Sequence, residues 1–596
     1  METIRQHTDR LNAYVGASTF GRIFRLEGCG HEQEIRNTRF TTELRAGLTT
    51  FFTMSYIIAV NASILADSGG DCVCNDASDP FCLQNAEYAI CKQDVNRSLV
   101  TATAAIAGFS SFLFGFLTNM PVALAPGMGL NAYFAYQIVG YHGSGIISYN
   151  LALTAVFIEG FVFVFLSLIG MRQWLVKIIP VSLKIAAACG IGLFLALIGL
   201  SSSEGIGAIS GGSSTPLQIA GCPEGYLKDG VCLSHKMTSP TMWLGIMAGG
   251  IVTAYLMAYK VKSAMIVGIL LVSIISWPRG TSVTYFPHNQ TGDSRFNFFK
   301  KVVEFHPIKQ LNVLDWNITK DPGNFIMALF TFLYVDIIDC TATLYSMARF
   351  SGVVDPESGD FPRSTLAYCT DAFCISIGAL LGTSPVTAFI ESGAGIAEGG
   401  KTGLTAMTCG ICFLISMFFA PLFASIPPWA TGCTLILVGC LMMRQITNIN
   451  WSYIGDAIPA FVTVMFIPFG YSAAYGLIAG LMVYTALNGM IYITKLVSRG
   501  RIVPDDEDHR EYWTIKPHGK LPWFYTASQA FADHVRGRRD NRNHDVSPSR
   551  VEDDGWEYQD RLGSKASNQN AELERVVVQA LPVNPRNEKV LRKEVR

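Results

Sequence analysis

Acidic side chains inside long apolar stretches are the residues of this sequence that are best suited to chemistry. Asp336 and Asp339 lie three residues apart within the apolar run 332–341, so a helix places both on one face. Two neighbouring carboxylates in a low-dielectric medium repel each other, and desolvation disfavours their charged forms. No Lys, Arg or His lies in the same apolar stretch. The pair predicts a proton-linked binding site, and the alternative is a buried packing pair hydrogen-bonded to Ser or Thr.

Two stretches rich in Gly and Pro interrupt the apolar pattern at 119–131 and 382–402, and the second contains Glu391. Irregular backbone at membrane depth must face protein or a water-filled cavity. A short helix that starts there aims free N–H groups at the membrane midplane. Each stretch therefore predicts a broken span that lines an internal site.

The two stretches align with each other when Pro121 is placed on Pro385. Interrupted segments in corresponding positions of two halves indicate the binding site of a transporter. Chance similarity between two Gly- and Pro-rich stretches is the alternative. The alignment also places Gly127 on Glu391 and Gly129 on Gly393.

Composition narrows the class of protein. Of 596 residues, 50% are hydrophobic and only 15% are charged, whereas soluble proteins are about 25% charged. This excludes a soluble enzyme, a disordered chain and a collagen-like fibre. The net charge of −1 carries no signal of nucleic-acid binding. The 15 Cys fall at no paired metal-ligand spacing beyond the pair at 72 and 74.

Apolar stretches of membrane-spanning length recur along the chain, because a bilayer core of about 30 Å needs about 20 apolar residues. The fourteen predicted spans cover 44–66, 99–119, 121–138, 149–170, 176–200, 241–259, 262–277, 323–348, 365–382, 384–399, 403–425, 429–446, 456–470 and 472–497. They divide into seven plus seven of opposite topology, with a broken stretch as the third span of each half.

Charge in the short loops predicts the orientation. Lys and Arg gather in alternate loops, which predicts that both termini are cytoplasmic. We expect a cytoplasmic N-terminal arm over 1–40, a transporter domain over 41–498, and a polar tail over 499–596. The tail combines charge runs with few apolar residues, so it is predicted to be cytoplasmic and largely disordered.

The loops predicted on the opposite side carry paired cysteines and glycosylation sequons. Even numbers of Cys in two such loops predict disulfides in an oxidising compartment, with the connectivity left open. The candidates are Cys72, Cys74, Cys82 and Cys91 in the loop 67–98, and Cys222 and Cys232 in the loop 201–240. Three sequons, all predicted in loops, begin at Asn96, Asn289 and Asn317. These features indicate a membrane protein of the secretory route.

A site built from helix N-termini and carboxylates has mixed preferences. Its N–H groups seek acceptors and its carboxylates seek donors, so a small neutral heterocycle with both suits it better than an anion does. Purines and pyrimidines fit, and so do some amides. Phe134, Tyr334 and Phe389 could stack on such a ring, and ordinary apolar packing is the alternative for each.

Three motifs carry a resemblance to a known family. They are APGMGLNAYFAY at 125–136, FLYVDIIDCTATLYSMARF at 332–350 and GTSPVTAFIESGAGIAEGGKTGLTA at 382–406. They resemble the AzgA-like purine permeases of fungi and plants, in the nucleobase–ascorbate and nucleobase–cation symporter superfamily. The likeness extends from residue 36 to residue 498.

The resemblance implies an all-α membrane fold of fourteen helices in a seven-plus-seven inverted repeat. Spans 1–4 and 8–11 would form a core domain, and spans 5–7 and 12–14 a gate domain. It further implies a homodimer in the plasma membrane that moves like an elevator. The implied activity is proton-coupled import of adenine, guanine and hypoxanthine, with H⁺ as coupling ion, no other cofactor and no enzymatic reaction.

The resemblance also implies roles for single residues. Asp336 and Glu391 match the acids that bind the nucleobase. Our mechanistic hypothesis, separate from the resemblance, is that either Asp339 or Glu391 carries the proton. The Glu391–Ser392 pair replaces the Gln–Asn pair of ascorbate and xanthine relatives, which favours the purine branch. The expected substrate-binding set is Asp336, Glu391, Asn131, Gly129, Gly393, Phe389 and Ser392. Glu159 and Asp456 are assigned to packing.

Three other functions stay open beside transport of purines. A transporter-like receptor would bind its ligand without accumulating it. An anion exchanger of the sulfate type is disfavoured by the carboxylates. An integral-membrane enzyme is least favoured, because no nucleophile–base pair or metal-ligand cluster appears within the spans.

Overall fold

The structure is a computed structural model that describes residues 2–506 with internal gaps. The gaps are 33, 73–84, 171–179, 202–204, 211–216, 220, 222–226, 229–230, 233–236, 262, 354–360, 472, 500–503 and 505. The predicted tail over 499–596 lies almost wholly outside the described residues, so its disorder stays a prediction.

The described chain is mostly helical. Its first half contains α1 (Glu2–Gly16), α2 (Thr19–Phe24), α3 (Phe40–Met54), α4 (Ile57–Asp67), α5 (Ala86–Thr118), β1 (Leu124–Pro126), α6 (Met128–Ala132), η1 (Tyr133–Ile138), η2 (Tyr141–Gly143), α7 (Tyr149–Ile169), α9 (Val181–Leu200), β2 (Ile209–Ser210), β3 (Gln218–Ile219), β4 (Leu227–Lys228), β5 (Val231–Cys232), α10 (Pro240–Leu244), η3 (Gly245–Ile251), α11 (Val252–Ala258), α12 (Ala264–Ser276) and α13 (Gln290–Phe299).

The second half has the same character. It contains η4 (Ile318–Lys320), α14 (Pro322–Phe350), α15 (Ser364–Leu380), β6 (Val386–Ala388), α16 (Ser392–Ala397), α17 (Gly403–Ser416), η5 (Met417–Phe419), α18 (Ala420–Phe423), α19 (Pro428–Met443), η6 (Arg444–Asn448), α20 (Ile454–Phe469) and α21 (Ala473–Val497). Within the described ranges, nine helices are long and apolar enough to cross a membrane, and three shorter apolar helices accompany them.

The predicted span over 99–119 differs most from the observed helix. α5 begins at Ala86, because the Asn85 side chain caps it by accepting hydrogen bonds from the backbone N–H groups of Glu87 and Tyr88. The helix therefore extends well beyond its apolar part. The prediction that Asn96 lies in a loop is wrong, since Asn96 is a half-buried residue within α5.

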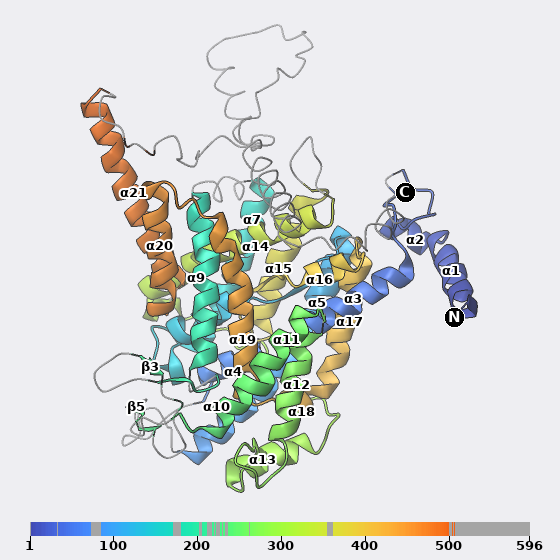
Figure 1. Cartoon of the computed structure of the whole chain (residues 1–596), viewed down its shortest axis with the longest axis horizontal. Helices are drawn as coiled ribbons and strands as arrows, with labels where there is room; N and C mark the ends of the chain where they lie inside the picture. The colour runs from blue at the N-terminus through green and yellow to red at the C-terminus, as the bar shows by residue number, and fades with distance from the viewer. Residues whose placement is uncertain are drawn as a thin grey trace, which may run out of the picture. The chain divides into compact units, whose positions relative to one another are not determined.

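The long helices pack in two groups. In one, α5 contacts α4, α15 and α17, and α3 contacts α17; in the other, α9 contacts α19, α20 and α21. Figure 1 shows α9, α20 and α21 side by side. α5 and α17 approach backbone to backbone at Gly115 and Gly403, where a Cβ on Gly403 would lie 1.9 Å from the carbonyl oxygen of Gly115. Small residues permit such close contact between membrane helices.

Candidate functional site

Two short strands cross between the broken stretches that the sequence singles out. β1 and β6 pair antiparallel, with Leu124 opposite Ala388 and Pro126 opposite Val386. Every residue of both strands is buried. Two further backbone hydrogen bonds extend the pairing, from Gly127 N to the Pro385 carbonyl (2.9 Å) and from Phe389 N to the Ala123 carbonyl (3.2 Å). The strand pairing joins segments more than 250 residues apart in the sequence.

Serine side chains bond the remaining polar backbone at this crossing. Ser111 of α5 donates to the Leu124 carbonyl (2.8 Å) and accepts from the Leu124 N–H (3.0 Å). Ser392, at the start of α16, accepts from the N–H of Ala123 (3.0 Å). Irregular backbone buried at membrane depth requires such partners. The predicted site residue Ser392 therefore holds the crossing together.

The connection from strand to short helix is longer in the second broken stretch than in the first, and this longer connection contains Glu391. One residue, Gly127, separates β1 from α6, whereas Phe389, Ile390 and Glu391 separate β6 from α16. Gly127 and Glu391 each stand directly before the helix, as the sequence alignment expects. The longer connection brings an acid and an aromatic ring to the crossing.

Glu391 and Asp339 form a half-buried pair beside the crossing. Both residues are partly exposed, and their two carboxyl groups interact electrostatically. The hydroxyl of Tyr56, at the junction of α3 and α4, donates to Oε1 of Glu391 at 2.9 Å. Tyr56 was not singled out from the sequence, and its position one residue before a helix restart is the signal that could have found it. These two acids are the ones that could meet a ligand in this conformation.

Asn131 belongs to a network of buried amides and hydroxyls next to the crossing. Its Nδ2 donates to the carbonyl of Asn61 at 3.5 Å. The Asn61 side chain donates to Oγ1 of Thr103 (2.8 Å) and accepts from the hydroxyl of Ser384 (3.3 Å). Among the described residues, Oδ1 of Asn131 has no hydrogen-bond partner. The network ties α4 and α5 to both broken stretches and leaves one acceptor unused.

Asp336 lies behind the half-buried pair. It is fully buried and interacts electrostatically with Glu159 of α7, Asp371 of α15 and Asp339. Sequence reasoning missed Asp371, although it meets the criterion used for the others, an acid inside an apolar stretch. It also assigned Glu159 to packing. The structure places Glu159, Asp336 and Asp371 together.

The other acids of the apolar stretches have partners of their own. Glu398 forms an ion pair with Arg45 at 3.1 Å, and Asp456 accepts from Nδ2 of Asn450 at 3.0 Å. Sequence reasoning also missed Glu43, a fully buried acid of α3. It accepts hydrogen bonds from the backbone N–H groups at 401 and 402 and from the Thr405 hydroxyl (2.7 Å). These acids connect helix ends.

The remaining predicted residues differ in burial. Phe134 is fully buried and meets Tyr149 edge-on, 5.2 Å between ring centroids, so it belongs to the core. Phe389 is also buried, whereas Gly129 and Gly393 are partly exposed. The N–H of Gly393 donates to the carbonyl of Ile390 at 2.9 Å, so the turn already uses it.

Tyr334 lies on α14 with its ring stacked on that of Phe330, 6.2 Å between centroids. It is half-buried and packs against the Leu183 and Tyr484 cluster contributed by α9 and α21. In this conformation Tyr334 therefore lies between the two helix groups.

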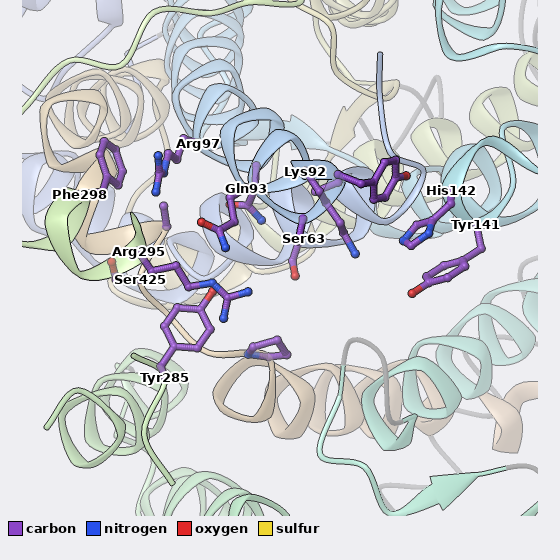
Figure 2. Close-up of a pocket in the computed structure, with 16 residues that line it drawn as sticks. Ser63, Lys92, Gln93, Arg97, Tyr141, His142, Tyr285, Arg295, Phe298 and Ser425 are labelled. Carbon is purple, nitrogen blue, oxygen red and sulfur yellow. The ribbon is translucent and has the colours of Figure 1, made fainter. Parts of the chain in front are cut away.

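A cavity of about 270 Å³ opens away from the crossing, beside the N-terminal part of α5. Its wall combines positive charge with aromatic rings. Figure 2 shows Lys92 of α5 and Arg295 of α13 at its wall. Lys92 is also paired with the fully buried Asp67. Asn96 lines the same cavity, so of the three sequons this one is the least suited to carry a glycan.

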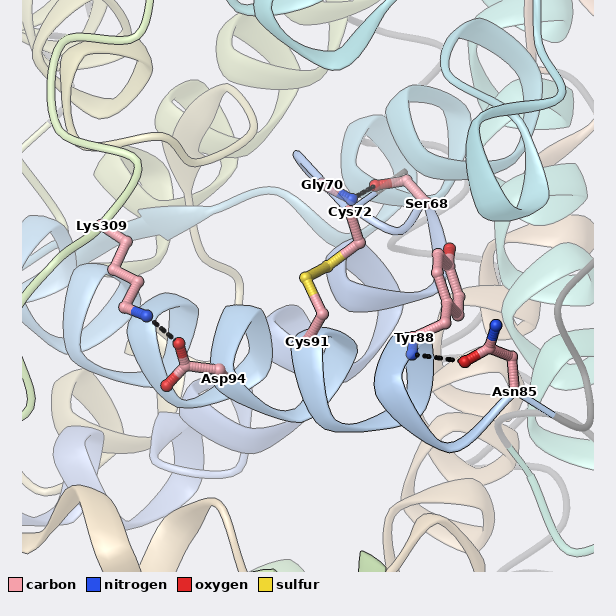
Figure 3. Close-up of a disulfide and its surroundings, with 8 residues drawn as sticks. All are labelled: Ser68, Gly70, Cys72, Asn85, Tyr88, Cys91, Asp94 and Lys309. Carbon is pink, nitrogen blue, oxygen red and sulfur yellow. Dashed lines mark hydrogen bonds and ion pairs between the residues drawn. A yellow bond between two sulfur atoms is a disulfide. The ribbon is translucent and has the colours of Figure 1, made fainter. Parts of the chain in front are cut away.

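A disulfide joins Cys72 to Cys91 near this cavity, with the two Cα atoms 6.0 Å apart (Figure 3). This confirms two of the six predicted disulfide cysteines and pairs them with each other. The bond connects the end of α4 to the first turns of α5. Cys74, Cys82 and Cys222 lie outside the described residues, and so does the side chain of Cys232.

The other two sequons lie in exposed connections. Asn289 caps α13, where its side chain accepts from the N–H of Gly292 at 2.6 Å. Asn317 is exposed before η4, and its side chain accepts from the hydroxyl of Thr319 at 2.8 Å. Both positions agree with the predicted loops, and glycosylation at either stays a prediction.

Comparison with known proteins gives one consistent result. The profile of the Permease family matches residues 41–478. "Efflux pump notK'" of Aspergillus versicolor is 57% identical over 89% of this chain and 92% of its own length. "Putative xanthine/uracil permease C887.17" of Schizosaccharomyces pombe is 56% identical over 87% and 83% of the two chains. "Adenine permease AdeP" of Escherichia coli is 31% identical over 81% and 92%.

Proposed function

The chain belongs to the Permease family, and we propose that it carries the purine nucleobases adenine, guanine and hypoxanthine across a membrane. It is a membrane transporter and not an enzyme. The name of AdeP, a relative that matches most of the chain, supports adenine. Guanine and hypoxanthine share with adenine a planar ring that carries both N–H donors and nitrogen acceptors, so one set of polar groups suits all three.

The observation that carries the proposal is the half-buried pair Asp339 and Glu391 at the crossing of β1 and β6. Carboxylates accept hydrogen bonds from ring N–H groups and repel anions. The Tyr56 hydroxyl donates only to Oε1 of Glu391, so this hydrogen bond leaves Oε2 for the purine. We assign the direct contacts with the purine to Glu391 and Asp339 in this conformation, with Asp336 behind them.

Neutral groups complete the proposed site. The unpartnered Oδ1 of Asn131 supplies a further acceptor. Gly393 keeps the approach to the crossing open, because it adds no side chain there, and Gly129 lets Ile191 of α9 pack closely against α6. Phe389 provides an apolar surface beside Glu391. Ser392 holds the crossing in shape through its bond to Ala123.

We propose fourteen spans in a seven-plus-seven repeat, with a core domain that moves past a gate domain. The nine long helices, the three shorter ones and the two broken stretches support this number. Closer packing of α5 with α4, α15 and α17, and of α9 with α19–α21, than between these two groups supports the division. A homodimer in the plasma membrane with both termini cytoplasmic completes the proposal, on the basis of the resemblance and the loop charges.

We further propose that transport is coupled to protons. Asp339 and Glu391 lie at the crossing, and Asp336 lies behind them with Glu159 and Asp371. In the described part of the spans, none of these acids has a Lys, Arg or His partner. Ionised acids in the membrane interior are costly, so protons and substrate together favour movement of the core. Sodium is the competing coupling ion, and the test below separates the two.

Uptake of radiolabelled hypoxanthine tests the function. Cells that lack their own purine carriers would express the wild type or Glu391→Ala, at pH 5.5 and pH 7.5, with and without an uncoupler and with and without sodium. Adenine, guanine, xanthine and uracil serve as competitors. We expect sodium-independent accumulation that adenine and guanine block, that the uncoupler abolishes and that Glu391→Ala loses. No uptake by protein confirmed at the cell surface would refute the proposal.

Export is a second candidate, favoured by one observation. The 57% identical relative from Aspergillus versicolor is named an efflux pump. Preloaded cells distinguish the two directions. Release of labelled purine faster than in control cells, without uptake under an inward proton gradient, would assign export.

A further inference from the structure

Three fully buried acids, Glu159 of α7, Asp336 of α14 and Asp371 of α15, form a group that we call the inner acid cluster. Asp and Glu are almost never fully buried unless they are paired. Here the neighbouring charged groups are other acids. Glu159 interacts electrostatically with Asp371, and Asp336 interacts with both, so none of the three gains a favourable ionic partner. The purine contacts proposed above do not use Glu159 or Asp371.

Close packing of α7 against α15 brings the cluster together. A Cβ on Gly160 would lie 2.2 Å from Oγ of Ser376 and 2.6 Å from the carbonyl oxygen of Ala372, so the two helices touch there. The Ser376 hydroxyl also donates to the carbonyl of Phe157 at 3.0 Å. Gly160 and Ala372 are the sequence neighbours of Glu159 and Asp371. The approach is therefore built into these helices at the level of the two acids.

The cluster lacks nitrogen and oxygen hydrogen-bond donors. Within the described part of the chain, no nitrogen or oxygen donor reaches any of the six carboxyl oxygens of Glu159, Asp336 and Asp371. The other titratable groups that act on the cluster come from α14 and α15. They are the Asp339 carboxyl, the Cys340 thiol, which is a weak donor to Asp371, and the Cys374 thiol. None of them is a cation.

A proton is the ligand that this arrangement fits. Buried carboxylates without donors cost several kcal/mol each when they are ionised. A proton on one carboxyl removes a charge and with it the repulsion between neighbouring acids. Among the described residues, the three acids are not arranged as a group that could hold a metal ion.

We propose that Glu159 and Asp371 together hold the coupling proton, and that Asp336 connects them to the half-buried pair at the crossing. This rests on the proposed function and assigns its coupling site to residues that do not contact the purine. The proton enters from water through Asp339, which is partly exposed and lies on the same face of α14 as Asp336. An O–H bond forms in the cluster on one side of the membrane and breaks on the other, where the proton returns to water.

Purified protein in liposomes tests the assignment with labelled adenine. The first readout is exchange of labelled for unlabelled adenine, which needs no net movement of protons. The second is accumulation driven by an inward pH gradient of one unit. One proton per adenine supports about tenfold accumulation, because a factor of ten corresponds to about 1.4 kcal/mol. The variants are Glu159→Gln and Asp371→Asn, with Glu159→Asp as the conservative variant.

Asp456→Asn is the matched control, because Asp456 is a buried acid that has its own donor, Asn450, on the other group of helices. We expect the wild type and Asp456→Asn to accumulate adenine about tenfold. Glu159→Gln and Asp371→Asn should still exchange adenine, but their accumulation should fall to about one, and Glu159→Asp should restore it in part.

Accumulation by Glu159→Gln and Asp371→Asn at the wild-type level would overturn the assignment. So would loss of exchange together with accumulation in both, since a structural role would then explain the result. A wild type that exchanges adenine without responding to the pH gradient would refute proton coupling itself. A wild type that does not exchange adenine would refute the proposed substrate.

Discussion

Removing the hydroxyl of Tyr56 should weaken purine binding without unfolding the protein. This hydroxyl donates to Oε1 of Glu391 at 2.9 Å, and Tyr56 is buried at the junction of α3 and α4. Tyr56→Phe leaves the ring in place and deletes only the donor. Glu391 then lacks the hydrogen bond that holds its carboxyl group in place.

The size of the effect follows from that bond. Hydrogen bonds to charged groups contribute about 1.5–3 kcal/mol, and each 1.4 kcal/mol corresponds to a factor of ten. The KM for adenine should therefore rise about ten- to hundredfold in Tyr56→Phe. Initial rates of labelled adenine uptake over a range of concentrations, normalised to protein at the membrane, measure it.

A matched variant separates this effect from a general loss of stability. The hydroxyl of Tyr149 is equally buried and donates to the carbonyl of Gly382 at 2.7 Å, away from Glu391. Tyr149→Phe should leave the KM within about twofold of the wild type, because its cost falls on stability. In a Glu391→Gln background, Tyr56→Phe should add little, since the two act through one interaction. An unchanged KM in Tyr56→Phe, or an equal rise in Tyr149→Phe, would refute the assignment.

Three further predictions concern other parts of the molecule. Gly129→Ala should lower the maximal transport rate about five- to hundredfold with little change in KM, because its Cβ would lie 2.9 Å from Ile191 of α9; an unchanged rate would contradict this packing. Replacing Cys72 and Cys91 by Ser should destabilise the purified protein by about 3 kcal/mol, since the disulfide closes a loop of 19 residues; melting with and without reductant measures it. Burial lowers the pKa of His306, which lies outside the spans. As pH falls below about 6.5, the unfolded chain therefore binds a proton at His306 more readily than the folded chain does, and the melting temperature should drop. His306→Gln should reduce that drop between pH 7.5 and pH 5.5, and an identical drop would contradict it.

Sequence reasoning found the broken stretches because their composition conflicts with an ordinary membrane helix. A Gly- and Pro-rich segment with an acid at membrane depth must be lined by protein, whichever partners it has. The structure bears this out in the β1–β6 crossing, and Gly127 and Glu391 do stand before their short helices. The three residues between β6 and α16, compared with one between β1 and α6, emerged only from the strand register.

Other features depended on contacts that no local pattern encodes. The polar start of α5 predicts a loop at Asn96, yet the helix already begins after the cap at Asn85 and includes Asn96. Asp336 and Asp339 share a helix face, but Asp336 is fully buried and Asp339 is only half-buried. Which side of a helix face meets a cavity depends on the neighbouring helices, and these are remote in sequence.

Apolar length, charge bias and broken helices are local properties of a chain in a membrane, because the bilayer acts on each segment separately. They identified a polytopic transporter, its two broken stretches and most of its acidic residues without any knowledge of packing. The grouping of Glu159, Asp336 and Asp371 is different in kind. It requires α7, α14 and α15 to meet at one level. The close contact of α7 with α15 is possible because Gly160 has no side chain, but the sequence does not say that α15 is the helix that packs there. Electrostatic coupling falls steeply with distance, so the partner of each acid is a consequence of tertiary packing.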